Sequence, residues 1–200
     1  ILIDIGSRKE LVLNGEFGVK GYDPKNGREL WFCKSFNGRG SPVPFFAHGL
    51  VYTVNGKPGD LDVVKPGGSG DVTKTRMAWH AKRRGGRDLP APAVIGDHVI
   101  VTAMSGVTSC YDARTGAEKW PEAKRIEGDF SGAPLIANGL YYIQNEAGTT
   151  YVLRPGKNLD VVAKNTLPSK PDEIFRATIV PVNGQVFLRS SKALYCVKGS

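Results

Sequence analysis

The sequence predicts an all-β chain, a β-propeller of four-stranded antiparallel blades. One reason is a repeated stretch that reads GYDPKNGRELW at 21–31 and CYDARTGAEKW at 110–120. Another is a Pro-centred apolar run, SPVPFFAHGLVYTV at 41–54, which returns as SGAPLIANGLYYIQ at 131–144. Short strands repeated at a period of about 45 residues are typical of propeller blades. The turn glycines show this period, with intervals of 47, 43 and 45 residues between Gly49, Gly96, Gly139 and Gly184.

Taken strand by strand, the chain holds about four and three-quarter blades in a single propeller segment over residues 1–200. The complete blades are predicted at about 1–35, 43–82, 91–123 and 132–167, and a partial blade at 177–199. The partial blade lacks its outer strand. Because propellers close by pairing strands from both ends of the chain, the segment is expected either to belong to a larger ring or to complete one as a homodimer.

Each predicted strand is a short run of alternating apolar and polar residues bounded by Gly, Asn, Asp or Pro, which favour turns. In the first two blades the runs lie at 1–6, 10–15, 19–24, 29–35, 43–49, 50–56, 61–67 and 74–82. In the next two they lie at 91–97, 98–104, 107–113, 117–123, 132–139, 140–146, 149–156 and 159–167. The partial blade has runs at 177–184, 185–190 and 193–199.

Two kinds of turn join the predicted strands. Asn-Gly pairs such as 138–139 favour positive φ at both centres of a type I′ turn, whose twist suits an antiparallel hairpin. Asp-x-x-x-Gly turns, which begin at Asp23 and Asp112, are expected between the third and fourth strands of a blade. Trp31 and Trp120 stand four residues past the closing Gly of these turns, and we expect them to fill the gap between neighbouring blades.

Composition fits a soluble globular chain. Of the 200 residues 40% are hydrophobic and 23% are charged. No apolar run approaches the ~20 residues that a membrane-spanning helix needs. The net charge of +8 raises the question of a polyanionic partner. The densest basic run contains Lys82, Arg83, Arg84 and Arg87, lies between two predicted strands and has no interleaved aromatic residue. We interpret it as a solvated loop and expect no nucleic acid partner.

The cysteines do not form a recognisable framework. Cys33, Cys110 and Cys196 are far apart, odd in number and without C-x-x-C spacing, so neither a disulfide scaffold nor a zinc site is expected. They are interpreted as buried strand thiols. Oxidation of one pair stays open at this point.

The repeats resemble those of a known family. YDPKNGRELW, then SPV, then HGLVYTV resemble the repeats of quinoprotein-type (pyrroloquinoline-quinone-like) propellers. That family includes quinone-dependent alcohol dehydrogenases and the periplasmic lipoprotein scaffold of the outer-membrane barrel-assembly machine. The segment LDVVKPGGSGDVTKTRMAWHAKR is similar to secreted or periplasmic propellers of planctomycete-type bacteria. The resemblance covers essentially the whole chain. It implies the C-terminal half of an eight-bladed propeller in the periplasm or outside the cell.

The resemblance also raises the question of a cofactor. Quinone enzymes of the family hold the quinone between a Trp and a disulfide of adjacent cysteines, beside a calcium ion ligated by Glu, Asn and Asp. This sequence has no adjacent cysteines, and its Trp residues are explained by the repeat. Asn145, Glu146 and Asp129 are the conceivable calcium ligands. No cofactor is expected, and pyrroloquinoline quinone with calcium is the alternative.

A glycine-rich stretch, KPGGSGDVTKT at 65–75, is the most unusual local motif. A phosphate-binding loop would place Lys directly after Gly and before a helix, whereas here Lys74 follows Thr73. We interpret the stretch as a widened hairpin between the third and fourth strands of the second blade. Irregular loops on a rigid scaffold often carry recognition, so Gly68, Ser69 and Asp71 become candidate binding residues.

No catalytic set emerges from the remaining polar residues. His48, His80 and His98 fall at different blade positions and predict no metal pair. Asp60 and Asp62 share a strand face without a partner pattern that indicates acid–base chemistry. No catalytic, cofactor-binding or metal residue is therefore assigned.

These observations favour a non-enzymatic binding or scaffold propeller outside the cytoplasm. Its partner is expected to be a protein or polysaccharide held by loops at one rim, over 33–42, 57–60, 65–75 and 82–90. The alternative is a pyrroloquinoline-quinone-dependent alcohol dehydrogenase whose remaining site residues lie in an N-terminal half. A third hypothesis is a module that spaces or dimerises a larger protein. The candidate binding residues are Gly68, Ser69, Asp71, Lys82, Arg83, Arg84 and Arg87.

Overall fold

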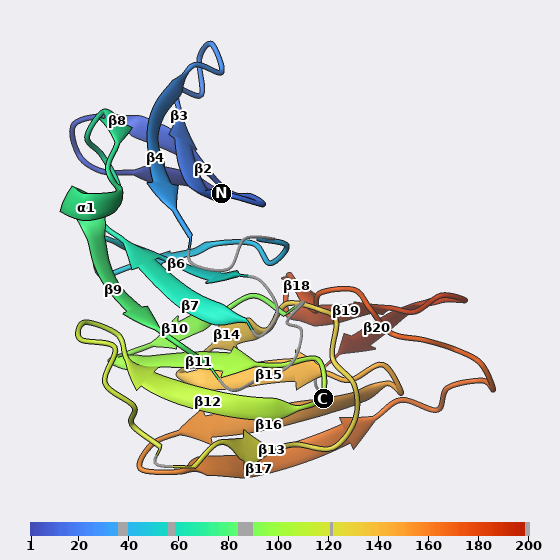
Figure 1. Cartoon of the computed structure of the whole chain (residues 1–200). Helices are drawn as coiled ribbons and strands as arrows, with labels where there is room; N and C mark the ends of the chain where they lie inside the picture. The colour runs from blue at the N-terminus through green and yellow to red at the C-terminus, as the bar shows by residue number, and fades with distance from the viewer. Residues whose placement is uncertain (36–39, 56–58, 84–89, 121, 199–200) are drawn as a thin grey trace.

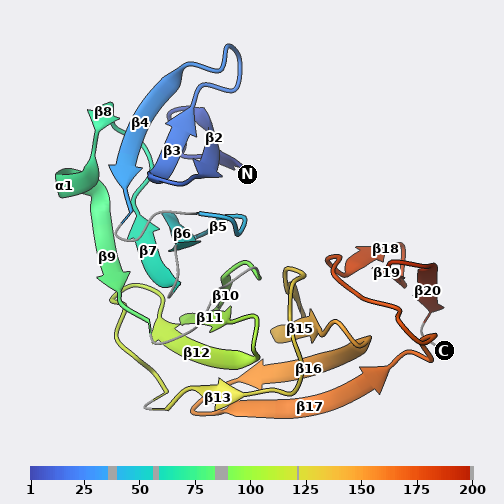
Figure 2. The same ribbon diagram turned by 45° about the vertical axis from the view of Figure 1, so that its right-hand side comes forward.

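The computed structural model describes residues 1–35, 40–55, 59–83, 90–120 and 122–198. These residues form five sheets that follow one another along the chain and lie around an open arc (Figure 1). In the turned view the middle sheets have their first strands on the inner side of the arc and their last strands on the outer side (Figure 2). This arrangement is a β-propeller of consecutive blades, and it confirms the predicted fold class.

Within each blade the strands follow one another in chain order and pair antiparallel, and the exception is β8 (Gly70–Asp71), which leaves blade two and joins the sheet of blade one. Blade one contains β1 (Leu2–Asp4), β2 (Lys9–Asn14), β3 (Gly18–Tyr22) and β4 (Glu29–Lys34). Blade two contains β5 (Phe45–Ala47), β6 (Leu50–Asn55), β7 (Asp60–Val64) and β9 (Met77–Ala81). Blade three contains β10 (Ala93–Ile95), β11 (His98–Thr102), β12 (Val107–Asp112) and β13 (Lys124–Arg125). Blade four contains β14 (Leu135–Ala137), β15 (Leu140–Gln144), β16 (Thr149–Pro155) and β17 (Leu159–Thr166), and blade five contains β18 (Val180–Val182), β19 (Gln185–Arg189) and β20 (Leu194–Lys198).

The strand predicted at 74–82 begins later than expected. Thr73–Arg76 instead form one helical turn, α1, in which the carbonyl of Val72 accepts the amides of Thr75 and Arg76 at 3.1 and 2.8 Å. Just before it, Gly70–Asp71 form a short strand, β8, that pairs in parallel with β4. Blade one thereby gains a fifth strand from a loop of blade two.

The prediction of an outer strand at 117–123 is also wrong, because the paired strand of blade three lies at Lys124–Arg125. Glu118 makes an isolated bridge to Tyr111, but regular pairing resumes only at Lys124–Arg125, opposite Val107 and Thr108. The register shifts between these two points, so a bulge interrupts the pairing with β12.

The hairpins between first and second strands follow the predicted turn chemistry. Asn138 and Asn183 have φ of 51° and 48°, and each is followed by a glycine with positive φ, as a type I′ turn requires. His48 takes the same left-handed conformation with φ of 51°. Asp23 and Asp112 close their predicted turns through their carbonyls, which accept amides four residues on at 2.8 and 2.9 Å.

Three buried clusters fill the spaces between successive blades from one to four. Strand β7 shows how the pleat supplies them. Leu61 and Val63 pack toward blade three, while Val64 packs toward blade one. Blades two and three meet through Tyr52, whose hydroxyl donates to the carbonyl of Ala113 at 2.8 Å.

The tryptophans lie between blades, as predicted. Trp79 donates its indole N–H to the carbonyl of Ala113 in blade three at 3.3 Å, and Trp120 donates to Gly156 in blade four at 3.1 Å. Trp31 lies in the cluster between blades one and two and is fully buried.

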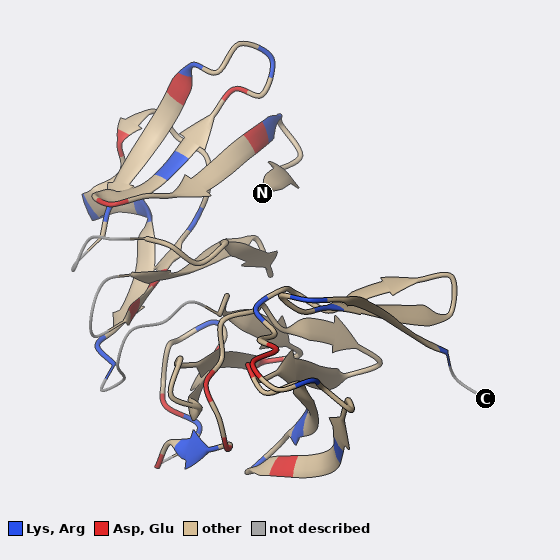
Figure 3. Cartoon of the chain, turned by 90° about the vertical axis from the view of Figure 1, so that its right-hand side faces the viewer, with Lys and Arg blue, Asp and Glu red and all other residues tan. Residues whose placement is uncertain are grey.

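The two end blades expose apolar side chains on their outer faces. Leu2 and Phe17 of blade one are 60% and 71% exposed, and Leu194 of blade five is 66% exposed. Charged residues are scattered over all the blades and do not gather on one of them (Figure 3). Within the described ranges, no helix has the length and apolar character that crossing a membrane requires.

Candidate binding surfaces

The antiparallel meander places the connections of each blade at two opposite ends. One end carries the turns between strands one and two and between strands three and four, and we call it the hairpin end. The other carries the link from strand two to strand three and the passage to the next blade, and we call it the crossover end. The segment 65–75 lies at the hairpin end, whereas the described residues of 33–42, 57–60 and 82–90 lie at the crossover end. The expectation that all four share one rim is therefore wrong.

Residues 65–76, here called the strap, pack onto blade one rather than forming a free widened hairpin. The amide of Val72 donates to the carbonyl of Phe32 at 2.8 Å, and the hydroxyl of Thr73 accepts the amide of Lys34 at 2.9 Å. The carbonyl of Gly68 accepts a 2.9 Å bond from Arg8. These contacts hold the predicted recognition loop in a defined conformation.

The three candidate residues of the strap differ in accessibility. Ser69 and Asp71 are exposed, while Gly68 is half-buried. The Asp71 carboxylate accepts the amide of Thr73 at 2.9 Å, and hydrogen bonds from Thr73 lower the pKa of Asp71 below its ordinary value. Asp71 thus stays ionised and serves partly to shape the turn.

A groove of about 500 Å³ lies between the strap and the inner turns of blades one and two. Its polar lining includes Arg8, Lys65 and Arg76, and Phe46 contributes an apolar side chain. Sequence reasoning missed both arginines, since Arg8 reaches the strap from blade one and Arg76 is positioned by the fold of the strap itself. The strap places Arg76 by a 2.9 Å bond from its Nη1 to the carbonyl of Pro66.

At the crossover end, the structure separates two residues that the sequence grouped together. Lys82 is exposed, as a solvated loop requires. Arg83 is only 2% exposed, so the prediction of a fully solvated basic run is wrong there. Its amide donates to Asp60 at 3.2 Å and its Nη1 to the carbonyl of Gly59 at 2.9 Å. Arg84 and Arg87 lie outside the described residues.

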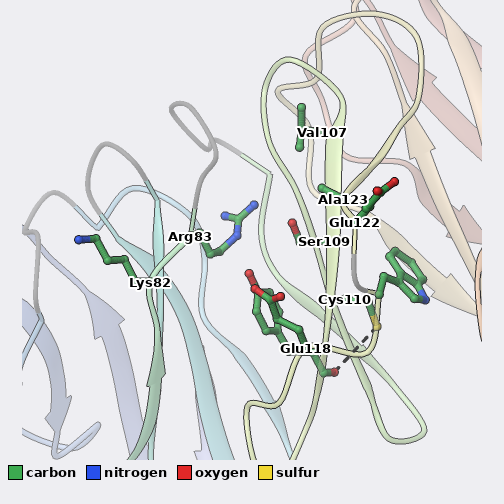
Figure 4. Close-up of a pocket in the computed structure, with 10 residues that line it drawn as sticks. Lys82, Arg83, Val107, Ser109, Cys110, Glu118, Glu122 and Ala123 are labelled. Atoms are coloured by element: carbon green, nitrogen blue, oxygen red, sulfur yellow. Dashed lines mark hydrogen bonds between the residues drawn. The ribbon is translucent and has the colours of Figure 1, made fainter.

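A second cavity, of about 830 Å³, lies where the outer strand of blade three bulges (Figure 4). Arg83 and Ser109 line it from opposite sides, together with Glu118 at the start of the bulge. Burial raises the pKa of Tyr111, which also lines this cavity. The lining combines donors such as Arg83 with acceptors such as Glu118. Among its described residues, no hydrogen bond joins a nucleophile to a general base.

The three histidines considered as metal ligands make hydrogen bonds or close contacts within the fold. His48 bonds to the carbonyl of Gly96 at 2.7 Å, which links the hairpin turns of two blades. His80 contacts the buried carboxylate of Asp60 at 3.1 Å, and His98 lies 2.7 Å from Asp97. Over the described part of the chain, no three His, Cys, Asp or Glu residues are arranged to hold a metal ion.

Two of the residues considered for calcium, Asn145 and Glu146, make contacts within the chain. Arg176 binds both carboxylate oxygens of Glu146, at 3.1 and 3.0 Å, and Ser131 donates to the same group. The amide oxygen of Asn145 accepts the backbone N–H of Thr149 at 2.8 Å. Each of these oxygens has a second lone pair, so calcium binding stays a prediction. Quinone binding remains a prediction that these contacts do not address.

The cysteines follow the sequence interpretation only in part. Cys33 and Cys110 are buried strand thiols, and burial raises the pKa of each to about 12. Cys196 is exposed on β20, contrary to expectation, because no further strand covers that part of blade five within the described residues. With their pKa raised in this way, the two buried thiols stay protonated at neutral pH.

Comparison with solved structures places the fold among propellers. BamB from Moraxella catarrhalis superposes with a TM-score of 0.74 at 16% identity, covering 99% of this chain and 57% of that one. The computationally designed Ika8 protein gives 0.69 at 12% identity, covering 98% and 57%. U3-55K gives 0.65 at 12% identity, covering 90% and 56%. The chain thus spans little more than half the length of these structures.

Comparison of sequences gives the family. No curated protein matches the chain. The family model described as outer membrane protein assembly factor BamB matches residues 15–155, which contain most of the first four blades. The chain therefore belongs to this family of pyrroloquinoline-quinone-repeat propellers.

Proposed function

We propose that the chain is a non-enzymatic binding scaffold that recognises a protein partner outside the cytoplasm. The observation that carries this proposal is the match of residues 15–155 to the outer membrane protein assembly factor family. A protein that assembles others must hold them, and a propeller offers rigid blades with exposed connections for that purpose. The periplasm or the extracellular space is the compartment that the family name supports.

The structure offers one candidate surface at each end of the blades. Ser69 marks the hairpin end and Lys82 the crossover end, and both are exposed. The backbone beside Ser69 is held by the bond from Arg8 to Gly68, and the backbone beside Lys82 by the bond from the Arg83 amide to Asp60. A surface held in this way loses little conformational entropy when a partner binds.

Photo-crosslinking in cells that make the full-length protein tests the proposal. A photoreactive amino acid replaces Ser69, Lys82 or, as a matched control, Asp160, which is exposed on the outer strand β17. We expect a discrete protein adduct from Ser69 or Lys82 and none from Asp160. Equal adducts at all three positions, or none at either end, would overturn the proposal. An adduct whose added mass is removed by glycosidase would replace the protein partner with a polysaccharide.

The same cells test the compartment. Fractionation should release the full-length protein with periplasmic or secreted markers. Recovery with cytoplasmic markers alone would contradict the proposed location.

We further propose that two copies associate through their end blades. The exposed Leu2, Phe17 and Leu194 support this, because apolar side chains at a sheet end gain from being covered. Light scattering of the 200-residue chain should give twice the monomer mass of 21.6 kDa. A monomer at high micromolar concentration would exclude this association.

A further inference from the structure

The groove beside the strap has a lining that indicates a particular class of ligand. It lies at the hairpin end, between the strap, the turn after β1 and the first strand of blade two. Its volume of about 500 Å³ is large enough for a few amino-acid side chains. No function has been attached to Arg8, Lys65 or Arg76 in the proposed scaffold role.

The cations of the groove are held in place in different ways. Arg8 is fixed by Glu10, whose buried carboxylate lies 2.7 Å from its Nη2, and by the carbonyl of Gly68. Arg76 is fixed by its bond to the carbonyl of Pro66. Lys65 is exposed. Among the described residues, neither Lys65 nor Arg76 has an acidic side chain within ion-pair distance.

The remaining lining includes apolar side chains and one carboxylate. Phe46, Ile5 and Pro66 supply hydrocarbon surface next to the cations. Asp4 also lines the groove, and its carboxylate accepts the amide of Gly6 at 2.8 Å. A compact dianion such as phosphate would be repelled by Asp4, whereas a peptide could turn its N–H groups toward it. The mixture therefore favours a peptide over a small inorganic anion.

We propose that this groove binds an acidic peptide segment of the partner, with a carboxylate against Lys65 and Arg76 and an apolar side chain over Phe46. The inference rests on the proposed scaffold function and names the chemistry that one of its surfaces recognises. Charge complementarity of this kind contributes orientation and association rate as well as affinity. Arg76 presents a planar guanidinium, which suits two-point contact with a carboxylate.

Nuclear magnetic resonance titration of the protein with a capped tripeptide, acetyl-Asp-Phe-Asp-amide, tests the inference. The amide signals of Gly67 and Gly68 should shift on addition. The neutral analogue acetyl-Asn-Phe-Asn-amide should bind at least about fivefold more weakly, as expected for the loss of partly exposed ion pairs. Inorganic phosphate should not displace the acidic peptide at equal concentration.

Substitutions in the strap provide the matched comparison. Lys65→Gln should weaken peptide binding about three- to fivefold without affecting the fold, because Lys65 is exposed. Arg76→Gln should weaken it further. Lys74→Gln removes an exposed cation of the same strap that does not line the groove, and it should leave binding unchanged.

Equal affinity for the neutral peptide, displacement by phosphate, or an unchanged affinity in Lys65→Gln would each overturn the inference. Those results would leave the scaffold proposal standing if the crosslinks from Ser69 or Lys82 persisted. Loss of the crosslinks with retained peptide binding would instead overturn the scaffold proposal and show a groove that binds acidic peptides without that role.

Discussion

The indole N–H of Trp31 donates a 2.7 Å hydrogen bond to the carboxylate of Glu10, and both side chains are fully buried. Arg8, which is partly exposed, binds the other carboxylate oxygen at 2.8 Å. A buried carboxylate is costly unless it is paired and hydrogen-bonded. Trp31 therefore serves two purposes, since it fills space between blades and also satisfies an internal charge.

Replacing Trp31 with Phe should lower the free energy of unfolding by about 2–4 kcal/mol. The variant leaves a cavity and removes a bond to a buried charge. Trp120→Phe is the matched control, because its indole donates to the neutral carbonyl of Gly156, and its loss should be smaller. Urea unfolding of both variants checks this, and equal losses would contradict the special role of Glu10.

Gly21 should not tolerate a side chain. A Cβ at Gly21 would lie 2.2 Å from Nε1 of Trp31, so Gly21→Ala should cost about 1–3 kcal/mol through overpacking. Gly15→Ala is the control, since the nearest atom to its Cβ would be the carbonyl oxygen of Gly18 at 3.5 Å. Thermal unfolding of the two variants should separate clearly, and similar midpoints would count against the steric argument.

Asp112 should contribute to the acid stability of blade three. Hydrogen bonds from the Thr115 amide and hydroxyl lower the pKa of Asp112 from 3.8 to about 2. Because the folded-state pKa is depressed, its stabilisation is present above pH ~4 and is lost as the pH falls toward ~2. Asp112→Asn should cost about 1–2 kcal/mol at pH 7, after allowance for solvent screening, and almost nothing at pH 2. Urea unfolding at both pH values measures this, and a pH-independent difference would contradict it.

The strap should depend on Val72, which is 4% exposed in the cluster between blades one and two. Val72→Ala should cost about 1–3 kcal/mol and increase amide hydrogen exchange in residues 65–76. Lys74→Ala, an exposed change in the same strap, should leave exchange unaltered. Exchange that rises equally in both variants would show that the strap is not held by the core.

The blades could be predicted from the sequence because their signals are local. Alternation and turn residues specify each hairpin, and Asn138 and Asn183 adopt the left-handed conformation that their Asn-Gly pairs indicate. The strand at 74–82 was misplaced because an alternating pattern does not show where a ladder begins. At 117–123 the bulge depended on a break in pairing with β12 that alternation alone does not show.

The candidate surfaces could be predicted only in part, because they depend on distant contacts. Ser69, Asp71 and Lys82 are exposed, as loop composition suggested. Arg83 is buried because Gly59 and Asp60, more than twenty residues earlier, receive its N–H groups. The approach of Arg8 to Gly68 joins residues sixty positions apart, and no local pattern encodes it.

The parallel pairing of β8 with β4 has a consequence for how the chain folds. Repeat proteins can fold one unit at a time, because each unit contacts only its neighbours. Blade one cannot complete its sheet before blade two is made, because Gly70–Asp71 of blade two cover its outer edge at Trp31–Phe32. During synthesis that edge stays open until Gly70–Asp71, which follow the third strand of blade two, have emerged. We therefore expect the first two blades to fold as one cooperative unit, in which Gly70–Asp71 close the transiently exposed edge.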